Sequence, residues 1–265
     1  MKITLLVDQQ EHETLQSEFG LALLLEDAAG NFLFDTGADT ALINNLKVLD
    51  IPPEKVQQII LSHGHYDHTG GLAYLTPEKI FCCKNVSQSH YSFHGKDDVH
   101  DITMPETAQQ ILQKSEKIYI EQFTAIADNI YLSGPIPRRS FEDCGGKFFH
   151  DKACTIPDTV SDEQALITTG GTLISGCCHA GIINTLEYCR EVHPEIVIHT
   201  VIGGLHLRHA AAERLSATAD YLRRSNIKTL ILLHCTGQNA VEYLQKQLPE
   251  CQVKTLRLGE SCFAD

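Results

Sequence analysis

The chain has 265 residues, enough to build one full hydrophobic core, and its 43% hydrophobic and 21% charged residues are ordinary for a globular enzyme. Its formal charge of −13 argues against nucleic acid as a partner, because neutralising phosphates requires a basic face. The apolar run at residues 3–7 is too short for a signal peptide or a membrane span, so we expect a single cytoplasmic domain over residues 1–265 with no membrane partner.

The chain begins with three predicted strands and one predicted helix, at residues 1–8, 21–26, 31–34 and 39–49. The second and third strands flank a turn-like stretch at 27–30, so they predict a hairpin. The hairpin runs directly into Asp35, whose side chain is placed to cap the following helix.

A dense group of potential metal ligands follows the apolar run 56–61, which predicts a strand. The group consists of His63, His65, Asp67 and His68. Imidazole nitrogens and carboxylate oxygens bind zinc, iron or manganese, and this group has more donors than one tetrahedral zinc takes from one side. It therefore predicts two metals, held at a strand-to-loop edge rather than on a helix. A chance surface cluster is the alternative, but glycines at 64, 70 and 71 let the backbone bend tightly around ions.

The stretch from about 85 to 161 is less regular than the rest. It follows a short helix and a strand at 79–84, and it predicts one helix and two short strands, at 107–114, 118–120 and 130–133. We interpret it as an insertion that builds a substrate pocket or lid, with a packing or disordered loop as the alternative. Three of its histidines are expected to be surface groups rather than ligands: His90, His94 and His100.

Three strand–loop–helix units in the second half each present a histidine after the carboxyl end of a strand. The strands lie at 172–175, 196–202 and 229–233, and the histidines are His179, His206 and His234. The first strand forms a hairpin with 165–168, and the remaining predicted elements are helices at 182–189, 210–224 and 239–248 and a last strand at 252–256. Ligand sites of α/β sheets lie at the carboxyl ends of strands, so we expect these histidines to join the earlier cluster.

Periodicity alone predicts only a mixed α/β fold, but several motifs resemble a known family. Residues 62–71 resemble the first metal motif of the metallo-β-lactamase superfamily. Five further motifs resemble, within it, the branch typified by the archaeal dihydropterin ribofuranosyl-aminobenzene phosphate synthase; they lie at 134–138, 162–166, 176–181, 203–207 and 234–237. The resemblance covers nearly the whole chain. It implies an α+β fold, the four-layer αββα sandwich with metals in a cleft at one edge.

The resemblance further implies two divalent metal ions, zinc in the first place and iron or manganese as alternatives. One ion would be held by His63, His65 and His179, and the other by Asp67, His68 and His234. Asp67 would also orient the attacking hydroxide. Asp35 would orient metal ligands, cap the following helix, or do both.

The chain departs from the hydrolases of this superfamily at the position that bridges the two metals, where they usually carry an aspartate. Cys177 stands there after Gly176. The bridging donor is therefore left open between a thiolate of Cys177, a carboxylate of Asp162 or Glu163, and water alone. All ten cysteines of the chain are expected to be reduced thiols, most of them buried.

Together these features favour a metal-dependent hydrolase that uses metal-activated hydroxide on a small anionic ester, phosphodiester or lactone. His206 is the candidate general acid or oxyanion donor, with a purely structural role as the alternative. Arg138 could pair with a substrate phosphate or carboxylate, or remain solvated. Two other functions stay open: a pterin-type transferase that releases pyrophosphate, and a non-catalytic metal-binding sensor. No oligomeric state is predicted.

Overall fold

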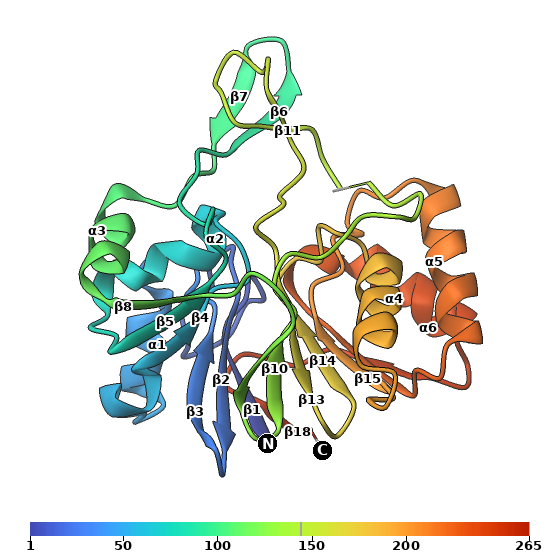
Figure 1. Ribbon diagram of the computed structural model, residues 1–265, viewed down its shortest axis with the longest axis horizontal. Coiled ribbons are helices and arrows are strands. Elements are labelled where there is room, and N and C mark those ends of the chain that lie inside the picture. Colours follow the sequence, from blue (N-terminus) through green and yellow to red (C-terminus); the bar gives the residue numbers. More distant parts are fainter. Residues whose placement is uncertain (144, 265) are drawn as a thin grey trace.

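A computed structural model describes residues 1–143 and 145–264. Two seven-stranded sheets pack face to face, and helices cover the outer face of each sheet (Figure 1). This arrangement is the αββα sandwich that the resemblance implies. In the described part of the chain, no helix is long and apolar enough to cross a membrane.

The first sheet is built by the N-terminal half and one strand from the end of the chain. Its order is β18-β1-β2-β3-β4-β5-β8, with bounds β1 (Lys2–Val7), β2 (Ala22–Asp27), β3 (Gly30–Phe34), β4 (Gln58–Ile60), β5 (Lys79–Cys82), β8 (Glu116–Tyr119) and β18 (Ser261–Phe263). The predicted hairpin is confirmed, since β2 and β3 pair antiparallel. β18 was not predicted, and it closes the edge of the sheet beside β1.

The second sheet has the order β17-β16-β15-β14-β13-β10-β9. Its bounds are β9 (Thr124–Ala127), β10 (Ile130–Leu132), β13 (Leu166–Thr168), β14 (Thr172–Ser175), β15 (Thr200–Gly203), β16 (Thr229–Leu232) and β17 (Gln252–Lys254). The four strands from β14 to β17 run parallel. Their carboxyl ends therefore meet at one edge, as the three predicted strand–loop–helix units require.

Helices α1 (Ala41–Val48) and α3 (Glu106–Lys114) lie outside the first sheet, and α4 (Ile182–Val192), α5 (Ala212–Arg224) and α6 (Gln238–Gln247) lie outside the second (Figure 1). The shorter helical turns are η1 (Pro53–Val56), α2 (Tyr66–Thr69), η2 (Gly70–Tyr74) and η3 (His234–Thr236). Two of these turns, α2 and η3, carry candidate ligands.

The hydrophobic core fills three interfaces, one between the sheets and one under each layer of helices. Ile3 and Leu5 of β1 face Ile202 of β15 between the sheets. Leu6 of β1 packs instead with the residues under α1, and Val201 of β15 packs with those under the other helices. Side chains of a strand alternate between its two faces. Both faces of these strands are buried, which explains why their sequences are continuously apolar.

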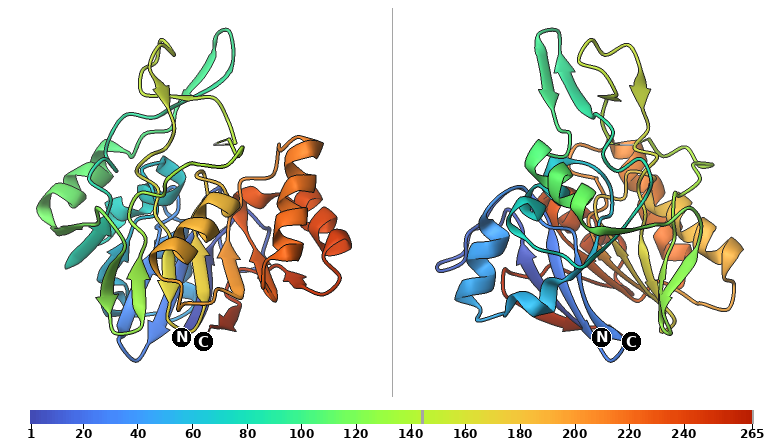
Figure 2. Two further views of the ribbon diagram at one scale, coloured as in Figure 1. Left: turned by 45° about the vertical axis from the view of Figure 1, so that its right-hand side comes forward. Right: turned by 60° about the vertical axis from the view of Figure 1, so that its left-hand side comes forward.

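A third, small sheet stands above the edge where the two main sheets open (Figures 1 and 2). Its order is β12-β11-β6-β7, with bounds β6 (Tyr91–Gly95), β7 (Asp98–Asp101), β11 (Phe148–Phe149) and β12 (Pro157–Asp158). None of these strands was predicted. The stretch 85–161 is thus divided, because α3, β8, β9 and β10 belong to the two main layers while its two outer parts pair above them.

Candidate metal centre

The histidine-rich motif leaves β4 at Ile60 and turns at once into the interior, where His63 and His68 are fully buried. Gly64 makes this turn possible, since a Cβ there would lie 2.1 Å from the backbone oxygen of Val86. Asp67 lies with His68 on the short helix α2, whereas a loop was expected. That expectation was wrong because a single helical turn is too short to show the 3.6-residue periodicity from which helices are predicted.

The first group of potential ligands contains His63, His65 and His179, whose ring nitrogens all lie within 4.8 Å of one another. The Nε2 atoms of His63 and His65 are buried and have no hydrogen-bond partner among the described residues. Burying an unpaired polar atom is costly, so these atoms fit a bound cation. Burial, reinforced by neighbouring histidines, lowers the pKa of both side chains well below the usual range. Both are therefore neutral imidazoles, the form that binds metals.

The second group contains Asp67, His68, Cys177 and His234, again within 4.8 Å of one another. Nε2 of His68 lies 3.1 Å from Sγ of Cys177, and Nε2 of His234 lies 3.2 Å from Oδ2 of Asp67. Burial disfavours the charged form of His68, but Asp67 and Asp35 outweigh it and raise its pKa to about 9. A cation among these atoms would displace that proton, as metal ligation requires.

Asp35 holds ligands of both groups in place. It has a positive φ of 60° after the end of β3, and its side chain is fully buried. Its Oδ2 contacts Nδ1 of His68 at 2.7 Å and accepts a 2.7 Å hydrogen bond from Oγ of Ser62, which lies 2.9 Å from Nδ1 of His63. These contacts leave both Nε2 atoms directed at the centre. The alternative role, a cap for α1, is not observed, since the N-cap residue is Thr40.

Cys177 belongs to two groups of ligand atoms. Besides the group with Asp67, its sulfur lies within 4.8 Å of ligand atoms of His179 and His206. Burial raises the pKa of its thiol well above the usual range. A neighbouring cation would have the opposite effect and favour the thiolate. Of the side chains left open as bridging donors, Cys177 is the one whose ligand atom lies within 4.8 Å of those of both Asp67 and His179.

The two carboxylates proposed as alternative bridging donors are committed to backbone contacts instead. Oδ2 of Asp162 accepts the N–H of Gly64 at 2.7 Å. The two oxygens of Glu163 accept the N–H groups of His179 and Ala180 at 2.5 and 2.6 Å. Both carboxylates are buried and neither belongs to a ligand group among the described residues. They fix the loops that carry the candidate ligands, and in this arrangement both are engaged by backbone N–H groups.

Glu163 gives a stability prediction. Burial raises the pKa of its carboxyl to about 7, although the two backbone N–H groups favour the charged form. Glu163→Gln replaces one acceptor with an N–H group that faces another N–H, so the free energy of unfolding should fall by about 1–3 kcal/mol. Urea unfolding measures this, with the exposed Glu191→Gln as control. An unchanged unfolding midpoint would show that the hydrogen bonds from His179 and Ala180 to Glu163 do not stabilise the fold.

The structure gives Arg138 and His90 contacts that the sequence did not predict. Arg138 donates its Nη1 to the backbone oxygen of His179 and its Nη2 to that of Thr159, so its guanidinium joins two loops of the protein. His90, expected at the surface, is buried, and its Nδ1 lies 2.6 Å from Oδ2 of Asp158. Its ring lies 5.0 Å from that of His65, between centroids. His94 and His100 are exposed on the small sheet, as expected.

His206 lies at the edge of the centre rather than within it. Its backbone has a positive φ of 47°, and its half-buried ring lies 4.4 Å from that of His179, between centroids. Its Nδ1 is buried without a hydrogen-bond partner in the described part of the chain. The ring is therefore close enough to the ligands either to bind a cation itself or to exchange a proton with a bound substrate.

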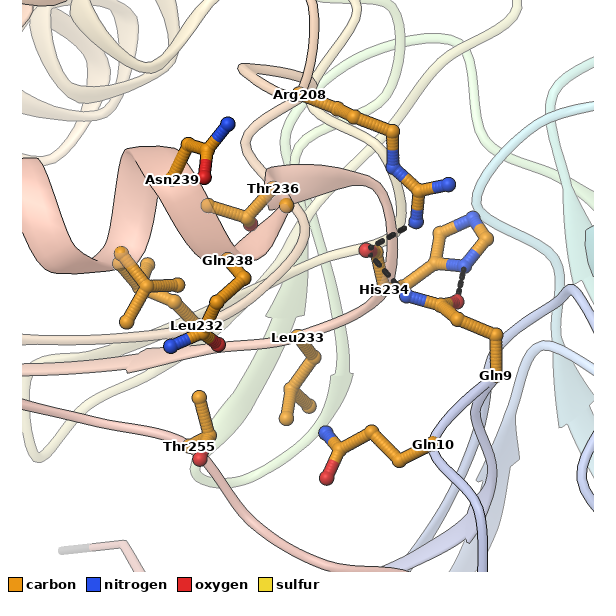
Figure 3. A pocket seen from close by; sticks show the side chains of 12 residues that line it. Gln9, Gln10, Arg208, Leu232, Leu233, His234, Thr236, Gln238, Asn239 and Thr255 are labelled. Carbon is orange, nitrogen blue, oxygen red and sulfur yellow. Dashed lines mark hydrogen bonds between the residues drawn. The ribbon is translucent and has the colours of Figure 1, made fainter.

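Residues directly after β1 support His234, the last candidate ligand, and this support was not predicted from the sequence. His234 has a strained positive φ of 48°. Its N–H donates to Oδ2 of Asp8 at 2.9 Å, and its backbone oxygen accepts Nε2 of Gln9 at 2.7 Å. The other end of the same amide, Oε1 of Gln9, lies 3.0 Å from Nδ1 of His234 (Figure 3). Gln9 thereby keeps a proton on Nδ1 and leaves Nε2 free to bind.

Gln9→Leu should therefore weaken binding of the metal at His234 by about 10- to 100-fold, the usual cost of losing a group that orients a ligand. Gln9→Glu should recover part of this loss because a carboxylate still accepts the Nδ1 proton. Chelator competition followed by metal analysis measures the affinity. Gln10→Leu is the matched control, since within the described residues the side-chain amide of Gln10 makes no hydrogen bond to His234. Equal affinities in all four proteins would refute the role of Gln9.

The centre opens into a cavity of about 370 Å³ beneath the small sheet. The cavity combines ligand-type side chains with aromatic walls from Phe19 and Phe148, and Arg208 lies at its margin. A small molecule in this cavity would contact the Asp67–Cys177 group directly. The lining is as follows: Phe19, His65, Tyr66, Asp67, Ser92, His94, His100, Asp101, Ile102, Phe148, Cys177, His179, His206, Arg208, His209, His234 and Cys235.

Comparison with known proteins agrees with this geometry. The family model of the metallo-β-lactamase superfamily matches residues 17–149. An uncharacterised protein of Methanocaldococcus jannaschii is 29% identical over 250 residues, which cover 92% of this chain and 94% of that protein. The 7,8-dihydropterin-6-methyl-4-(β-D-ribofuranosyl)-aminobenzene-5′-phosphate synthase of the same organism is 28% identical over 254 residues, 88% of this chain and 86% of the synthase. The crystal structure of Tm1679, a metal-dependent hydrolase of the β-lactamase superfamily, superposes over 100% of both chains with a TM-score of 0.87 and 27% identity.

Proposed function

The chain belongs to the metallo-β-lactamase superfamily, and from this premise we propose that it is a metal-dependent hydrolase that uses two divalent cations. The proposed substrate is a small anionic ester, phosphodiester or lactone. One observation carries the proposal: a group of buried ligand atoms around His63, His65 and His179 lies beside the group of Asp67, and the sulfur of Cys177 in the latter also lies within 4.8 Å of a ligand atom of His179. Such an arrangement suits two cations that share a donor.

The donor set favours zinc over the alternatives. Imidazole suits zinc and iron, while a thiolate selects softer metals and argues against manganese. Cys177 supplies that thiolate only where thiols stay reduced, which is consistent with our proposal of a cytoplasmic protein. When bound, two such cations lower the pKa of a coordinated water towards neutrality and polarise the bond that is cleaved.

The residues around the cations have separate tasks in this proposal. Asp67, beside His234, is placed to orient the attacking water as well as to bind. His206 holds a proton at Nδ1 for the leaving group or donates it to the developing oxyanion. Phe19 and Phe148 line the cavity and exclude water from the apolar part of the substrate.

A pterin-type transferase that releases pyrophosphate is the second candidate. Two observations favour it: Cys177 stands where hydrolases of the superfamily carry an aspartate, and the chain is 28% identical to the synthase. A transferase needs an activated electrophile rather than an activated water. A thiolate of Cys177, which neutralises charge on the metals without orienting a water, would therefore suit a transferase.

Metal analysis together with a substrate panel tests the proposal. Protein purified without added metal should contain two metals per chain and, once loaded, should hydrolyse at least one ester, phosphodiester or lactone. Pyrophosphate release from a pterin pyrophosphate, with no turnover of the panel, would replace the hydrolase by the transferase. Two bound metals without any turnover would instead favour a metal-binding sensor.

A further inference from the structure

His234 of the candidate metal centre also lines a second cavity (Figure 3). It has a volume of about 410 Å³ and shares only Arg208 and His234 with the cavity beneath the small sheet. Amide and hydroxyl side chains dominate the lining, which reads Gln9, Gln10, Arg208, Leu232, Leu233, His234, Thr236, Gly237, Gln238, Asn239, Val241 and Thr255. The lining has no Asp or Glu, although the chain contains 34 such residues and has a net charge of −13.

Arg208 supplies the formal positive charge of this lining. Its Nη2 contacts the backbone oxygen of His234 at 3.3 Å, and its guanidinium lies 5.4 Å from the ring centroid of Phe19. Within the described residues it forms no ion pair, so its charge is not neutralised. The contacts with His234 and Phe19 hold the guanidinium in place before any ligand arrives, which lowers the entropic cost of binding.

The backbone is shaped to admit this side chain. Gly237 has a positive φ of 78°, and a Cβ there would lie 2.9 Å from both Cα and Cβ of Arg208. Around the same space, the side chains of Gln10, Asn239 and Thr255 make no hydrogen bond to a described residue, whereas Nε2 of Gln238 donates to Glu242 at 2.8 Å. Side-chain N–H and O–H donors are therefore available in the same cavity as the unpaired guanidinium of Arg208.

We propose that this cavity is an anion subsite, which receives a phosphate or carboxylate group of the substrate while the reacting bond lies at the metal centre. Arg208 is common to both cavities and binds the anionic group, with Gln10, Asn239 and Thr255 completing its hydrogen bonds. The inference rests on the proposed function and names its specificity determinant. It also assigns to Arg208 the anion-binding task that the sequence suggested for Arg138.

The kinetic test compares esters with and without a distal anion: 4-nitrophenyl hexanoate against the 4-nitrophenyl monoesters of adipic and suberic acid. The measured quantity is the ratio of kcat/KM for a monoester to that for the hexanoate, because changes at the metals affect both substrates. Arg208→Ala should lower this ratio by about tenfold or more, the size of a lost charge-assisted hydrogen bond. Arg208→Lys should lower it less, since it keeps the charge but not the planar fork.

Asn239→Asp is the second variant. It places a carboxylate in the cavity without changing the size of the side chain, and an acidic residue in the first turn of α6 does not disfavour the helix. It should lower the ratio as well. Arg139→Ala is the matched control, since that exposed arginine pairs with Glu191 on another face. A ratio that stays the same in both Arg208→Ala and Asn239→Asp would overturn the subsite.

A binding test separates failure of the subsite from failure of the proposed hydrolysis. Inorganic phosphate is titrated calorimetrically into the metal-loaded wild type and the same variants. If no ester is turned over, a Kd raised about tenfold in Arg208→Ala, and raised in Asn239→Asp, still supports the subsite. Equal Kd values in all proteins would mean that phosphate binds only at the metals, and would overturn it.

Discussion

The variants His68→Ala and His234→Ala are each expected to bind one metal per chain instead of two and to lose more than about a hundredfold of the hydrolytic rate, because changing a residue that merely orients a ligand already costs about 10- to 100-fold. Both side chains belong to the group of Asp67 and Cys177. Their loss removes imidazole donors from one metal only, so the metal at His63 and His65 should remain.

Elemental analysis and steady-state rates on the same preparations measure this effect. His193→Ala is the matched control, a half-buried histidine that contacts Glu195 at the end of α4. Because His68 and His234 are buried, urea unfolding should be recorded alongside, to separate metal loss from unfolding. A folded variant with two metals, or with the full rate, would show that the second group does not bind a catalytic metal.

Cys177 carries the second large prediction. Cys177→Ala and Cys177→Ser should weaken binding of the pair of metals and lower the rate, because each removes the thiolate common to two groups of ligand atoms. In cobalt-substituted protein, the thiolate-to-metal charge-transfer absorption of the near ultraviolet should disappear in both variants. Cys178→Ala is the matched control, since that neighbouring sulfur contacts Oγ1 of Thr185.

Cys177→Asp then separates the two proposed reactions. An aspartate restores the donor that hydrolases of the superfamily usually carry, so the variant should keep two metals. If the protein is a hydrolase, ester turnover should be retained or increased relative to Cys177→Ala. If it is a transferase, release of pyrophosphate should fall while slow hydrolysis appears. Charge-transfer absorption that persists in Cys177→Ala would show that another thiol binds the metal.

Gln9 links metal binding at His234 to the proposed anion subsite. Gln9 and Arg208 both contact the backbone oxygen of His234, and both line the proposed anion subsite. An anion bound to Arg208 would compete with that oxygen for the N–H groups of the guanidinium. The affinity for the metal at His234 and the affinity for the anion are therefore expected to depend on each other.

The sequence by itself predicted the clustered potential ligands and, through the family resemblance, the layers around them. His63, His65, Asp67 and His68 lie within six consecutive residues, so their proximity does not depend on the fold. The strands that carry His179 and His234 are continuous apolar runs followed by glycines and a helix, and such local patterns predict elements well. Parallel strands bring their carboxyl ends to one edge, which is why histidines far apart along the chain could be expected to meet.

Only the tertiary structure decided how the donors are completed and supported. Cys177, Asp162 and Glu163 were equivalent candidates as bridging donors in the sequence, and hydrogen bonds to Gly64, His179 and Ala180 account for the two carboxylates. Gln9 and His234 are 225 residues apart, and His90 and Asp158 are 68 apart. No local pattern encodes such pairs, because they form only when segments far apart along the chain pack together. Short sequence motifs predict the candidate ligands, whereas the side chains that orient these ligands come close to them only through long-range contacts.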